Sequence, residues 1–326
     1  MKKAALVTGA GGFIGSHLVG ELLAAGWRVV GLDNFDPFYD RSIKEKRLSD
    51  LTARPGFEFH ETDIRDSTGV QRLLAGVDVV LHLAARPGVR ASISDPLEYV
   101  SVNVQGTVSV LEAARAAGVR QFVYASSSSV YGPDASLPFK EQSPVGPLSP
   151  YSASKLAGEQ FCSVYSRLHD FRVAILRLFT VYGPGQRPDL AIHRFTSRLS
   201  SGLPVVMFGD GSSERDYTHV TDISTGIIRA IQWVSNGAPT CEVFNLGNGR
   251  ATALRGVIDL VATALGSEPL IEEAPLAIGD LSRTCADIGK AARVLGYDPK
   301  ISIEEGIPDF VNWYEATHGR TTKANG

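Results

Sequence analysis

A tyrosine and a lysine stand four residues apart in the segment Tyr151-Ser152-Ala153-Ser154-Lys155. Ser149 and Pro150, just before it, suit the N-cap and the first residue of a helix, on which side chains four apart share one face. A nearby ammonium, together with the positive charge of a nicotinamide, would lower the pKa of the phenol, so this pair predicts a tyrosine able to act as a base near neutral pH. Such pairs also arise by chance, and a second reactive group nearby would strengthen the interpretation.

Four consecutive serines, Ser126–Ser129, supply such a group, because they follow the apolar segment Gln121–Ala125, a predicted strand. Ligands of parallel sheets bind at the carboxyl ends of the strands. A serine hydroxyl at that point could hydrogen-bond to the oxygen that gains or loses the proton. The alternative is a polar turn without a chemical role.

A glycine-rich turn follows the first predicted strand, and its Gly9, Gly12 and Gly15 are spaced three residues apart. Glycine allows a tight turn, close approach of the backbone to a pyrophosphate, and close packing of a helix whose N–H groups face the phosphates. Asp33 lies 18 residues after Gly15, where a carboxylate binds both ribose hydroxyls and repels a 2′-phosphate. The pattern predicts a dinucleotide site that prefers NAD to NADP.

Short apolar segments alternate with amphipathic ones through the first half of the chain. The apolar segments lack strict alternation, which is typical of strands buried on both faces of a parallel sheet. The predicted strands are Ala4–Thr8, Arg28–Leu32, Phe57–His60, Asp78–Leu83, Gln121–Ala125 and Arg172–Leu178, and the predicted helices are Phe13–Ala25, Ser67–Leu74, Pro96–Ala117 and Tyr151–His169. This order predicts an α/β fold with a Rossmann-type doubly wound parallel sheet. Asp63 and Ile64, after the third strand, would contact an adenine or, equally well, begin a helix.

The alternation of predicted strands and helices ends after about residue 180, where glycine and proline cluster. We expect residues 1–180 to form the dinucleotide-binding domain, joined by a returning strand near 243–246. Residues 181–326 are expected to form a smaller substrate-binding lobe.

Composition excludes several classes of protein. The 326 residues carry a net charge of −3, so the chain lacks the excess of positive charge that is typical of nucleic-acid-binding proteins. No apolar run approaches the about 20 residues that a membrane-spanning helix needs. The cysteines, Cys162, Cys241 and Cys285, are too scattered for a disulfide framework or a metal site. We therefore expect a cytoplasmic protein without a metal, nucleic-acid or membrane partner.

Several motifs together resemble the extended short-chain dehydrogenase/reductase family over essentially the whole length. Besides the glycine-rich turn and the Tyr151/Lys155 pair, they are His82-Leu83-Ala84-Ala85, Asn103-Val104-Gln105-Gly106-Thr107 and Arg215-Asp216-Tyr217-Thr218-His219-Val220. The resemblance implies an enzyme of nucleotide sugars that holds NAD in its first lobe. It makes Tyr151 the catalytic base, Lys155 the group that binds the nicotinamide ribose, and Ser127 the assisting hydroxyl.

The same resemblance implies further contacts. Those to the cofactor would come from Gly9, Gly12, Phe13, Ile14, Gly15, Asp33, Asn34, Asp63, Ile64, Leu83, Ala84, Ala85, Asn103, Tyr151 and Lys155. Arg215 would hold the diphosphate of the substrate and Asp280 its ribose. UDP-galactose epimerases usually have an arginine three residues before that aspartate, where this chain has Ala277.

Three segments are similar to UDP-glucuronic acid 4-epimerases: residues 31–40, residues 86–90 and residues 179–189. Oxidation of a glucuronate at C4 gives a β-keto acid, which loses CO₂ readily unless its carboxylate is clamped. An arginine fork suits that task, and Arg187 is the predicted clamp. The alternative is a solvated loop arginine. The other substrate contacts implied are Gly88, Val89, Arg90, Ser128, Ser129 and Thr180.

Ser128 and Ser129 stand where related 4,6-dehydratases carry an Asp-Glu pair and UDP-glucuronate decarboxylases a glutamate. The two serines lack the acid of those enzymes, but they fit a UDP-galactose 4-epimerase as well. The three similar segments and Arg187 favour 4-epimerisation of UDP-glucuronate to UDP-galacturonate. A UDP-glucose/UDP-galactose 4-epimerase, a UDP-glucuronate decarboxylase and a non-catalytic NAD(H) sensor remain as alternatives. Small and apolar residues extend beyond one face of helices 96–117 and 151–169, and the family forms a dimer through this pair, so we expect a homodimer.

Overall fold

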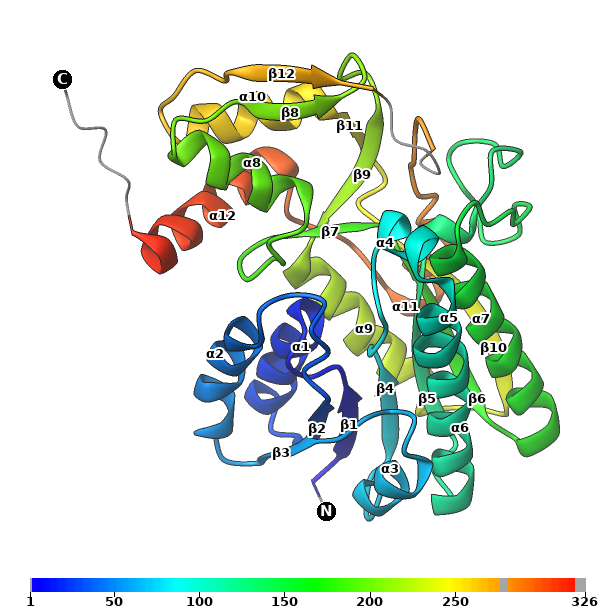
Figure 1. Cartoon of the computed structure of the whole chain (residues 1–326). Coiled ribbons are helices and arrows are strands. Elements are labelled where there is room, and N and C mark those ends of the chain that lie inside the picture. The colour runs from blue at the N-terminus through cyan, green and yellow to red at the C-terminus, as the bar shows by residue number, and fades with distance from the viewer. Residues whose placement is uncertain (1, 276–280, 320–326) are drawn as a thin grey trace.

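The computed structural model describes residues 2–275 and 281–319. Its centre is a seven-stranded sheet in the order β10-β6-β5-β4-β1-β2-β3, in which every neighbouring pair is parallel (Figure 1). The strands are β1 Ala4–Thr8, β2 Arg28–Asp33, β3 Phe57–Glu61, β4 Val79–His82, β5 Gln121–Ser127, β6 Arg172–Leu178 and β10 Thr240–Leu246. This confirms the predicted doubly wound α/β sheet.

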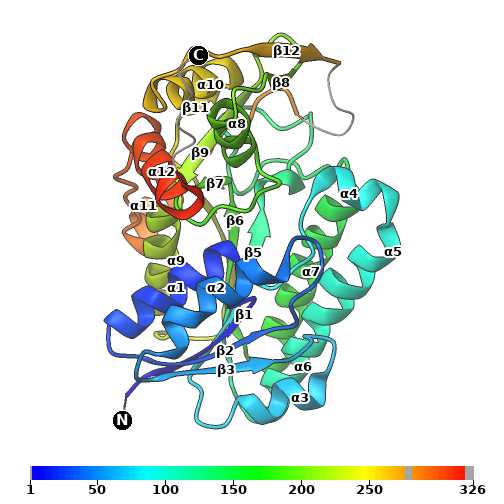
Figure 2. The ribbon, with the colours of Figure 1, turned by 60° about the vertical axis from the view of Figure 1, so that its left-hand side comes forward.

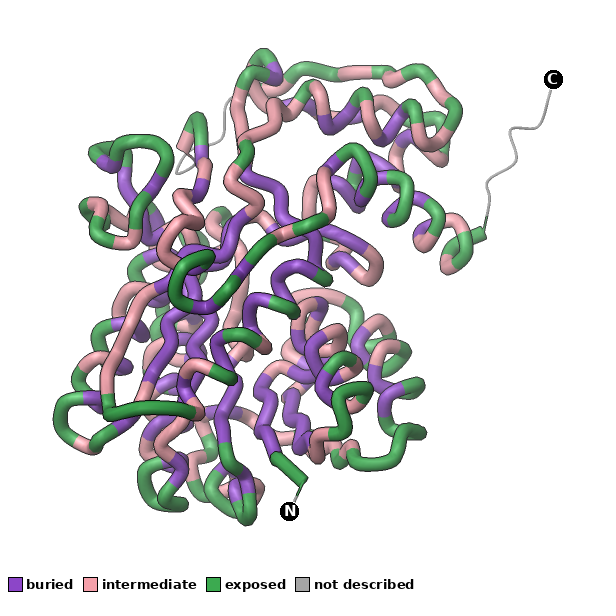
Figure 3. Tube along the Cα trace, turned by 180° about the vertical axis from the view of Figure 1, so that it is seen from behind, coloured by how far each residue is buried: buried purple, intermediate pink, exposed green. Residues whose placement is uncertain are grey.

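Helices cover both faces of the sheet (Figure 2). Side chains alternate across a strand, so Ala5 and Val7 of β1 pack into one apolar cluster and Leu6 into the other. The first cluster lies under α1 and α9, and the second under α3, α6 and α7. The bounds are α1 Phe13–Ala24, α9 Val220–Val234, α3 Ser67–Leu73, α6 Gly106–Ala117 and α7 Pro150–His169. Figure 3 shows the buried segments gathered between these layers.

Two stretches differ from the sequence prediction. The helix expected over 96–117 is divided into α5 Pro96–Tyr99, a π-helical turn η1 Val100–Gln105, and α6. The wider turn lets the Asn103 side chain bond to the backbone of Arg86 and to Ser154. A helix α2, Arg41–Thr52, was not predicted, because half of this segment is charged and it buries only Lys44, Leu48 and Leu51.

The remaining elements stand above the carboxyl ends of the main strands (Figure 1). They comprise the sheet β11-β9-β7, the strand pair β12-β8, and helices α8, α10 and α12, which enclose a third apolar cluster. Their bounds are β7 Thr180–Tyr182, β8 Val205–Phe208, β9 Glu214–His219, β11 Ala251–Ala253, β12 Ile271–Ala274, α8 Ala191–Ser200, α10 Leu254–Ala264 and α12 Ile303–His318. The other helical elements of the described residues are α4 Val89–Ser94, the 3-10 turn η2 Ser128–Val130 and α11 Gly289–Leu295.

The chain leaves the main sheet after β6 and returns to it with α9 and β10. Because α9 packs on α1 and β10 pairs with β6, no single cut near residue 180 separates the two parts. We propose a first lobe of residues 4–180 and 220–247 together with α11, which packs on α9 and β10, and a second lobe from the rest. Within the described ranges, no helix is long and apolar enough to cross a membrane.

Candidate active site

The turn between β1 and α1 is shaped so that glycine alone fits. A Cβ on Gly15 would lie 2.1 Å from the carbonyl oxygen of Gly9, and one on Gly12 would lie 3.0 Å from the same atom. Gly9 itself has a φ of +72°, and its Cβ would lie 3.0 Å from the backbone of Ala84. Gly12 is the N-cap of α1 and offers no side-chain cap to the first N–H groups. These features fit a cofactor pyrophosphate.

The Asp33 carboxylate lies at the end of β2, 6% exposed, with one oxygen engaged. Its Oδ1 accepts from the Phe35 N–H at 2.8 Å and from the Lys44 ammonium at 3.0 Å. Its Oδ2 faces the glycine-rich turn, because a Cβ on Gly11 would lie 3.2 Å from it. This placement suits a ribose hydroxyl, and Lys44 adds a buried cation that the sequence argument did not include.

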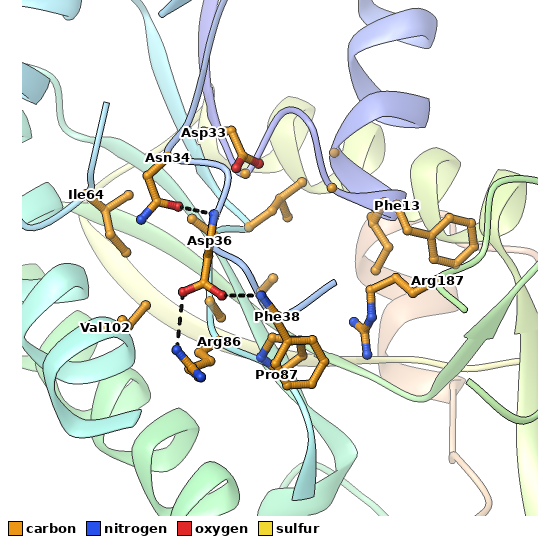
Figure 4. A pocket seen from close by; sticks show the side chains of 18 of the residues that line it. Phe13, Asp33, Asn34, Asp36, Phe38, Ile64, Arg86, Pro87, Val102 and Arg187 are labelled. Atoms are coloured by element: carbon orange, nitrogen blue, oxygen red, sulfur yellow. Dashed lines mark hydrogen bonds and ion pairs between the residues drawn. The ribbon is translucent and has the colours of Figure 1, made fainter. Parts of the chain in front are cut away.

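One cavity collects most of the predicted cofactor residues (Figure 4). The predicted residues that line it are Gly9, Gly12, Phe13, Ile14, Gly15, Asp33, Asn34, Ile64, Leu83, Ala84, Ala85, Tyr151 and Lys155. Asp63 and Asn103 stand behind this lining. Asp63 accepts a hydrogen bond from Asn34 and pairs with Arg65, and Asn103 holds the backbone of Arg86.

Tyr151, Lys155 and Ser127 come together where α7 begins and β5 ends. Ser149 caps α7 by accepting from the Ser152 N–H, and Tyr151 and Lys155 follow on successive turns. Burial raises the pKa of Tyr151, while a hydrogen bond with Ser127 and the charge of Arg187 work to lower it. Burial also lowers the pKa of Lys155 to about 8. Among the groups of the chain itself, burial outweighs those that lower the pKa of the phenol. That Lys155 and a positive nicotinamide together lower this pKa stays a prediction.

The serines after β5 divide into two roles. Ser126 points inward and donates to Glu159 at 2.5 Å, and Glu159 pairs with the buried Arg177 at 2.7 Å. Ser127 accepts from the N–H of Ser129 at 3.1 Å and from its hydroxyl at 2.9 Å. Of the four, Ser127 is the one whose hydrogen bond reaches the phenol of Tyr151.

A second cavity adjoins the first and shares Tyr151 and Arg187 with it. Of the residues predicted to bind substrate, it is lined by Gly88, Val89, Ser128, Ser129, Thr180, Arg187 and Arg215. Arg90 does not line it, and its guanidinium carbon lies 4.3 Å from the ring centroid of Phe208 in β8. Asp280 lies outside the described residues.

Arg187 stands at the boundary of the two cavities, on the loop between β7 and α8. Its Nε and Nη2 donate to the two carboxylate oxygens of Asp189, each at 2.9 Å. A guanidinium has five N–H donors, so Nη1 and the second hydrogen of Nη2 still form a fork at the far end. Figure 4 shows the side chain directed into the cavity beside Phe38.

Sequence reasoning missed several residues around this site. Tyr99 packs edge-on against the Tyr151 ring, at 6.2 Å between centroids, and donates to the Pro87 carbonyl oxygen at 2.5 Å. Asp36 forms a 3.4 Å ion pair with Arg86 across the cofactor cavity (Figure 4). These contacts join segments that lie far apart in the chain, and no spacing in the sequence signals them.

Known proteins resemble this chain over most of its length. A sequence profile of the NAD dependent epimerase/dehydratase family matches residues 5–247. A Bacillus cereus UDP-glucuronic acid 4-epimerase, solved with UDP-glucuronic acid and NAD, superposes with a TM-score of 0.92 at 35% identity, covering 97% of this chain and 100% of that one.

Two further relatives carry different activities in their names. A UDP-glucuronate 4-epimerase of Thermodesulfobacterium geofontis is 38% identical, over 94% of this chain and 95% of that protein. A UDP-glucose 4-epimerase of Mycolicibacterium smegmatis is 40% identical, over 95% of this chain and 97% of that protein. Identity at this level does not decide between the two sugars.

Proposed function

This chain belongs to the NAD-dependent epimerase/dehydratase family, and from that premise we propose that it converts UDP-glucuronate to UDP-galacturonate by inversion at C4. NAD-dependent 4-epimerisation of a UDP-sugar is the activity that the family and the relatives support. The choice of a hexuronate rests on one observation. Arg187, whose guanidinium keeps an end-on pair of N–H donors beyond those bonded to Asp189, lines the same cavity as Tyr151 and the serine loop.

The cofactor is NAD, which the glycine-rich turn, Asp33 and Lys155 would hold. When bound, NAD takes a hydride from the sugar carbon and later returns it. Tyr151 removes the C4 hydroxyl proton, and Ser127 hydrogen-bonds to the same oxygen. After the sugar has turned to show its other face, Tyr151 gives the proton back to the C4 oxygen.

Arg187 protects the oxidised sugar from a side reaction. A 4-keto hexuronate loses CO₂ when the bond to its carboxylate stands perpendicular to the carbonyl plane. The end-on fork of Arg187 would hold the carboxylate out of that orientation. Ser128 and Ser129 offer no carboxylic acid that could deliver a proton for dehydration or complete a decarboxylation.

Asp189 supports the second candidate, a UDP-glucose 4-epimerase. Because Asp189 already neutralises Arg187, a sugar with a neutral hydroxymethyl group would not leave an unpaired cation in the cavity. The Mycolicibacterium smegmatis relative has that activity in its name.

Arg187→Ala separates the two candidates. We expect the KM for UDP-glucuronate to rise by the equivalent of about 1.5–3 kcal/mol, the value of a lost charged hydrogen bond. Some turnovers would end in CO₂ and a UDP-4-keto-pentose, with a slow rise of reduced-nicotinamide absorbance. Arg187→Lys should restore only part of the binding, because an ammonium lacks the planar fork.

The control is Arg194→Ala, which removes an exposed arginine from α8, seven residues further along. If the Arg187→Ala variant binds UDP-glucuronate as the wild type does and gives no decarboxylated product, the result would favour the UDP-glucose 4-epimerase.

We also propose a homodimer that forms through α5 and α7. Exposed large apolar side chains on these helices and on η1 are Leu97, Val100, Phe161, Val164 and Leu168, with Leu97 80% and Leu168 69% exposed. An exposed apolar surface of this kind is typical of a protein interface.

A further inference from the structure

Arg47, on α2, joins three segments that lie far apart in the chain. Its Nη1 donates to the carbonyl oxygen of Gly11 at 3.2 Å and to the hydroxyl of Tyr39 at 2.9 Å. Its Nη2 donates to the carbonyl oxygen of Gly185 at 2.6 Å. One guanidinium therefore holds the glycine-rich turn, the 34–40 loop after β2 and the 183–189 loop after β7.

Two of these segments determine where the Arg187 side chain lies. The 183–189 loop carries Arg187 itself, two residues beyond Gly185. The 34–40 loop carries Phe38, whose ring centroid lies 5.9 Å from the guanidinium carbon of Arg187 (Figure 4). Arg47 therefore contacts Gly185, two residues before Arg187, and Tyr39, the residue after Phe38.

Other contacts fix the 183–189 loop without reaching the 34–40 loop. His17 of α1 is hydrogen-bonded to the carbonyl oxygen of Pro184 at 2.7 Å. Gln186 donates to the carbonyl oxygen of Val181 and accepts from the N–H of His193, each at 3.2 Å. Arg47 differs from both, because it fixes the two loops relative to each other.

We propose that Arg47 is a positioning residue that sets the grip of Arg187 on the hexuronate carboxylate. It acts through the two loops, and the proposal rests on the proposed function of Arg187. A planar cation with five donors can serve three acceptors at once, whereas a lysine at this position would reach fewer of them. Loss of Arg47 should therefore weaken the binding of the carboxylate more than that of the rest of the substrate.

Initial rates of full-length Arg47→Ala and Arg47→Lys, purified with bound NAD, test this with UDP-glucuronate and UDP-glucose. For Arg47→Ala we expect the KM for UDP-glucuronate to rise about tenfold, with a smaller change in kcat and in the KM for UDP-glucose. Decarboxylated product should appear, and Arg47→Lys should fall between the alanine variant and the wild type. If the alanine variant does not fold or loses NAD, the lysine variant serves for the same comparison.

Arg28→Ala is the matched control. Arg28 also donates to two backbone carbonyl oxygens, those of Ala75 and Gly76, each at 3.0 Å, and it lies at the start of β2, away from the carboxyl ends. Its loss should leave the KM for UDP-glucuronate unchanged.

A double-mutant cycle distinguishes a failure of this inference from a failure of the proposed function. If Arg47 acts through Arg187, the Arg47→Ala change should add little to the KM for UDP-glucuronate in an Arg187→Ala background. Additive effects, or an equal rise in KM for both sugars, would overturn the positioning role and leave the function standing. An Arg187→Ala variant with a normal KM for UDP-glucuronate would overturn both.

Discussion

Burial works against both members of the Tyr151–Lys155 pair, because it raises the pKa of the phenol and lowers that of the ammonium to about 8. The two groups that favour the phenolate are the hydroxyl of Ser127 and the charge of Arg187. The residue proposed to clamp the carboxylate would therefore also favour the phenolate of Tyr151, the proposed base. Substitution of Arg187 should shift the pH profile of turnover toward higher pH.

Tyr151→Phe keeps the ring against Tyr99 and removes only the hydroxyl. We expect turnover to fall by at least ~10²-fold, the scale of general acid–base catalysis, while NAD stays bound. Rates with each UDP-sugar and the NAD content of the purified protein measure this. Near-normal turnover across the pH range would show that another group is the base.

Asp33→Ala leaves the buried ammonium of Lys44 without its carboxylate. NAD should bind more weakly, because a ribose partner is lost, and NADP should bind more tightly than to the wild type, because a cation now faces the 2′ position. Titration with both dinucleotides measures the change in selectivity. Equal losses of affinity for NAD and NADP would contradict a role for Asp33 at the ribose. The double variant Asp33→Ala/Lys44→Ala should lose the gain in NADP affinity.

At the scale of the element, α1 offers a matched pair of glycines. A Cβ on Gly15 would lie 2.1 Å from the Gly9 carbonyl oxygen, whereas one on Gly20 would lie no closer than 3.9 Å to the nearest atoms outside the helix. Gly15→Ala should therefore displace the turn and abolish NAD binding. Gly20→Ala should keep NAD and raise stability by roughly 0.5–1 kcal/mol, because alanine favours the helix. Cofactor content and thermal unfolding of both variants measure this contrast.

Elements that depend on local patterns were predictable, and elements that depend on distant contacts were not. The glycine-rich turn and the apolar strands follow from spacing and side-chain type. The interruption of the 96–117 helix depends on Asn103 meeting the backbone of Arg86, which the sequence does not signal. For the same reason most residues that line the two cavities could be named, but not Lys44 or Tyr99, the pairing of Arg187 with Asp189, or the three acceptors of Arg47.

At the scale of the whole molecule, buried neutral histidines link stability to pH. Burial lowers the pKa of His82, between Thr8 and Thr107, to about 3, and that of His193 to about 4. Below about pH 6.5 these histidines bind protons in the unfolded state, where their pKa is near 6.5, but stay neutral in the folded state until the pH falls much lower. The free energy of unfolding should therefore fall as the pH drops below about 6.5.

Urea unfolding at a series of pH values measures this slope. His82→Gln, which cannot take up a proton in the unfolded state, should reduce the slope even if it lowers stability at every pH. An unchanged slope would mean that His82 does not contribute to the linkage.

The proposed homodimer predicts that a charge on its apolar surface separates the subunits. Val164→Glu on α7 should convert a dimer to a monomer, because a carboxylate buried in an apolar interface is costly. Leu203→Glu is the control, since Leu203 is similarly exposed, at 49% against 45%, and lies outside α5 and α7. The sedimentation coefficients of the wild type, Val164→Glu and Leu203→Glu test this prediction. A monomeric wild type would contradict the proposed homodimer.

The last strand of the main sheet, β10, is also the last to leave the ribosome. Until residues 240–246 emerge, β6 presents an unpaired edge, while the whole of the α8–β9 region has already been made. The nascent chain must therefore keep its half-finished sheet from pairing with neighbouring chains for the time it takes to synthesise about 60 residues, a few seconds at ordinary rates of translation.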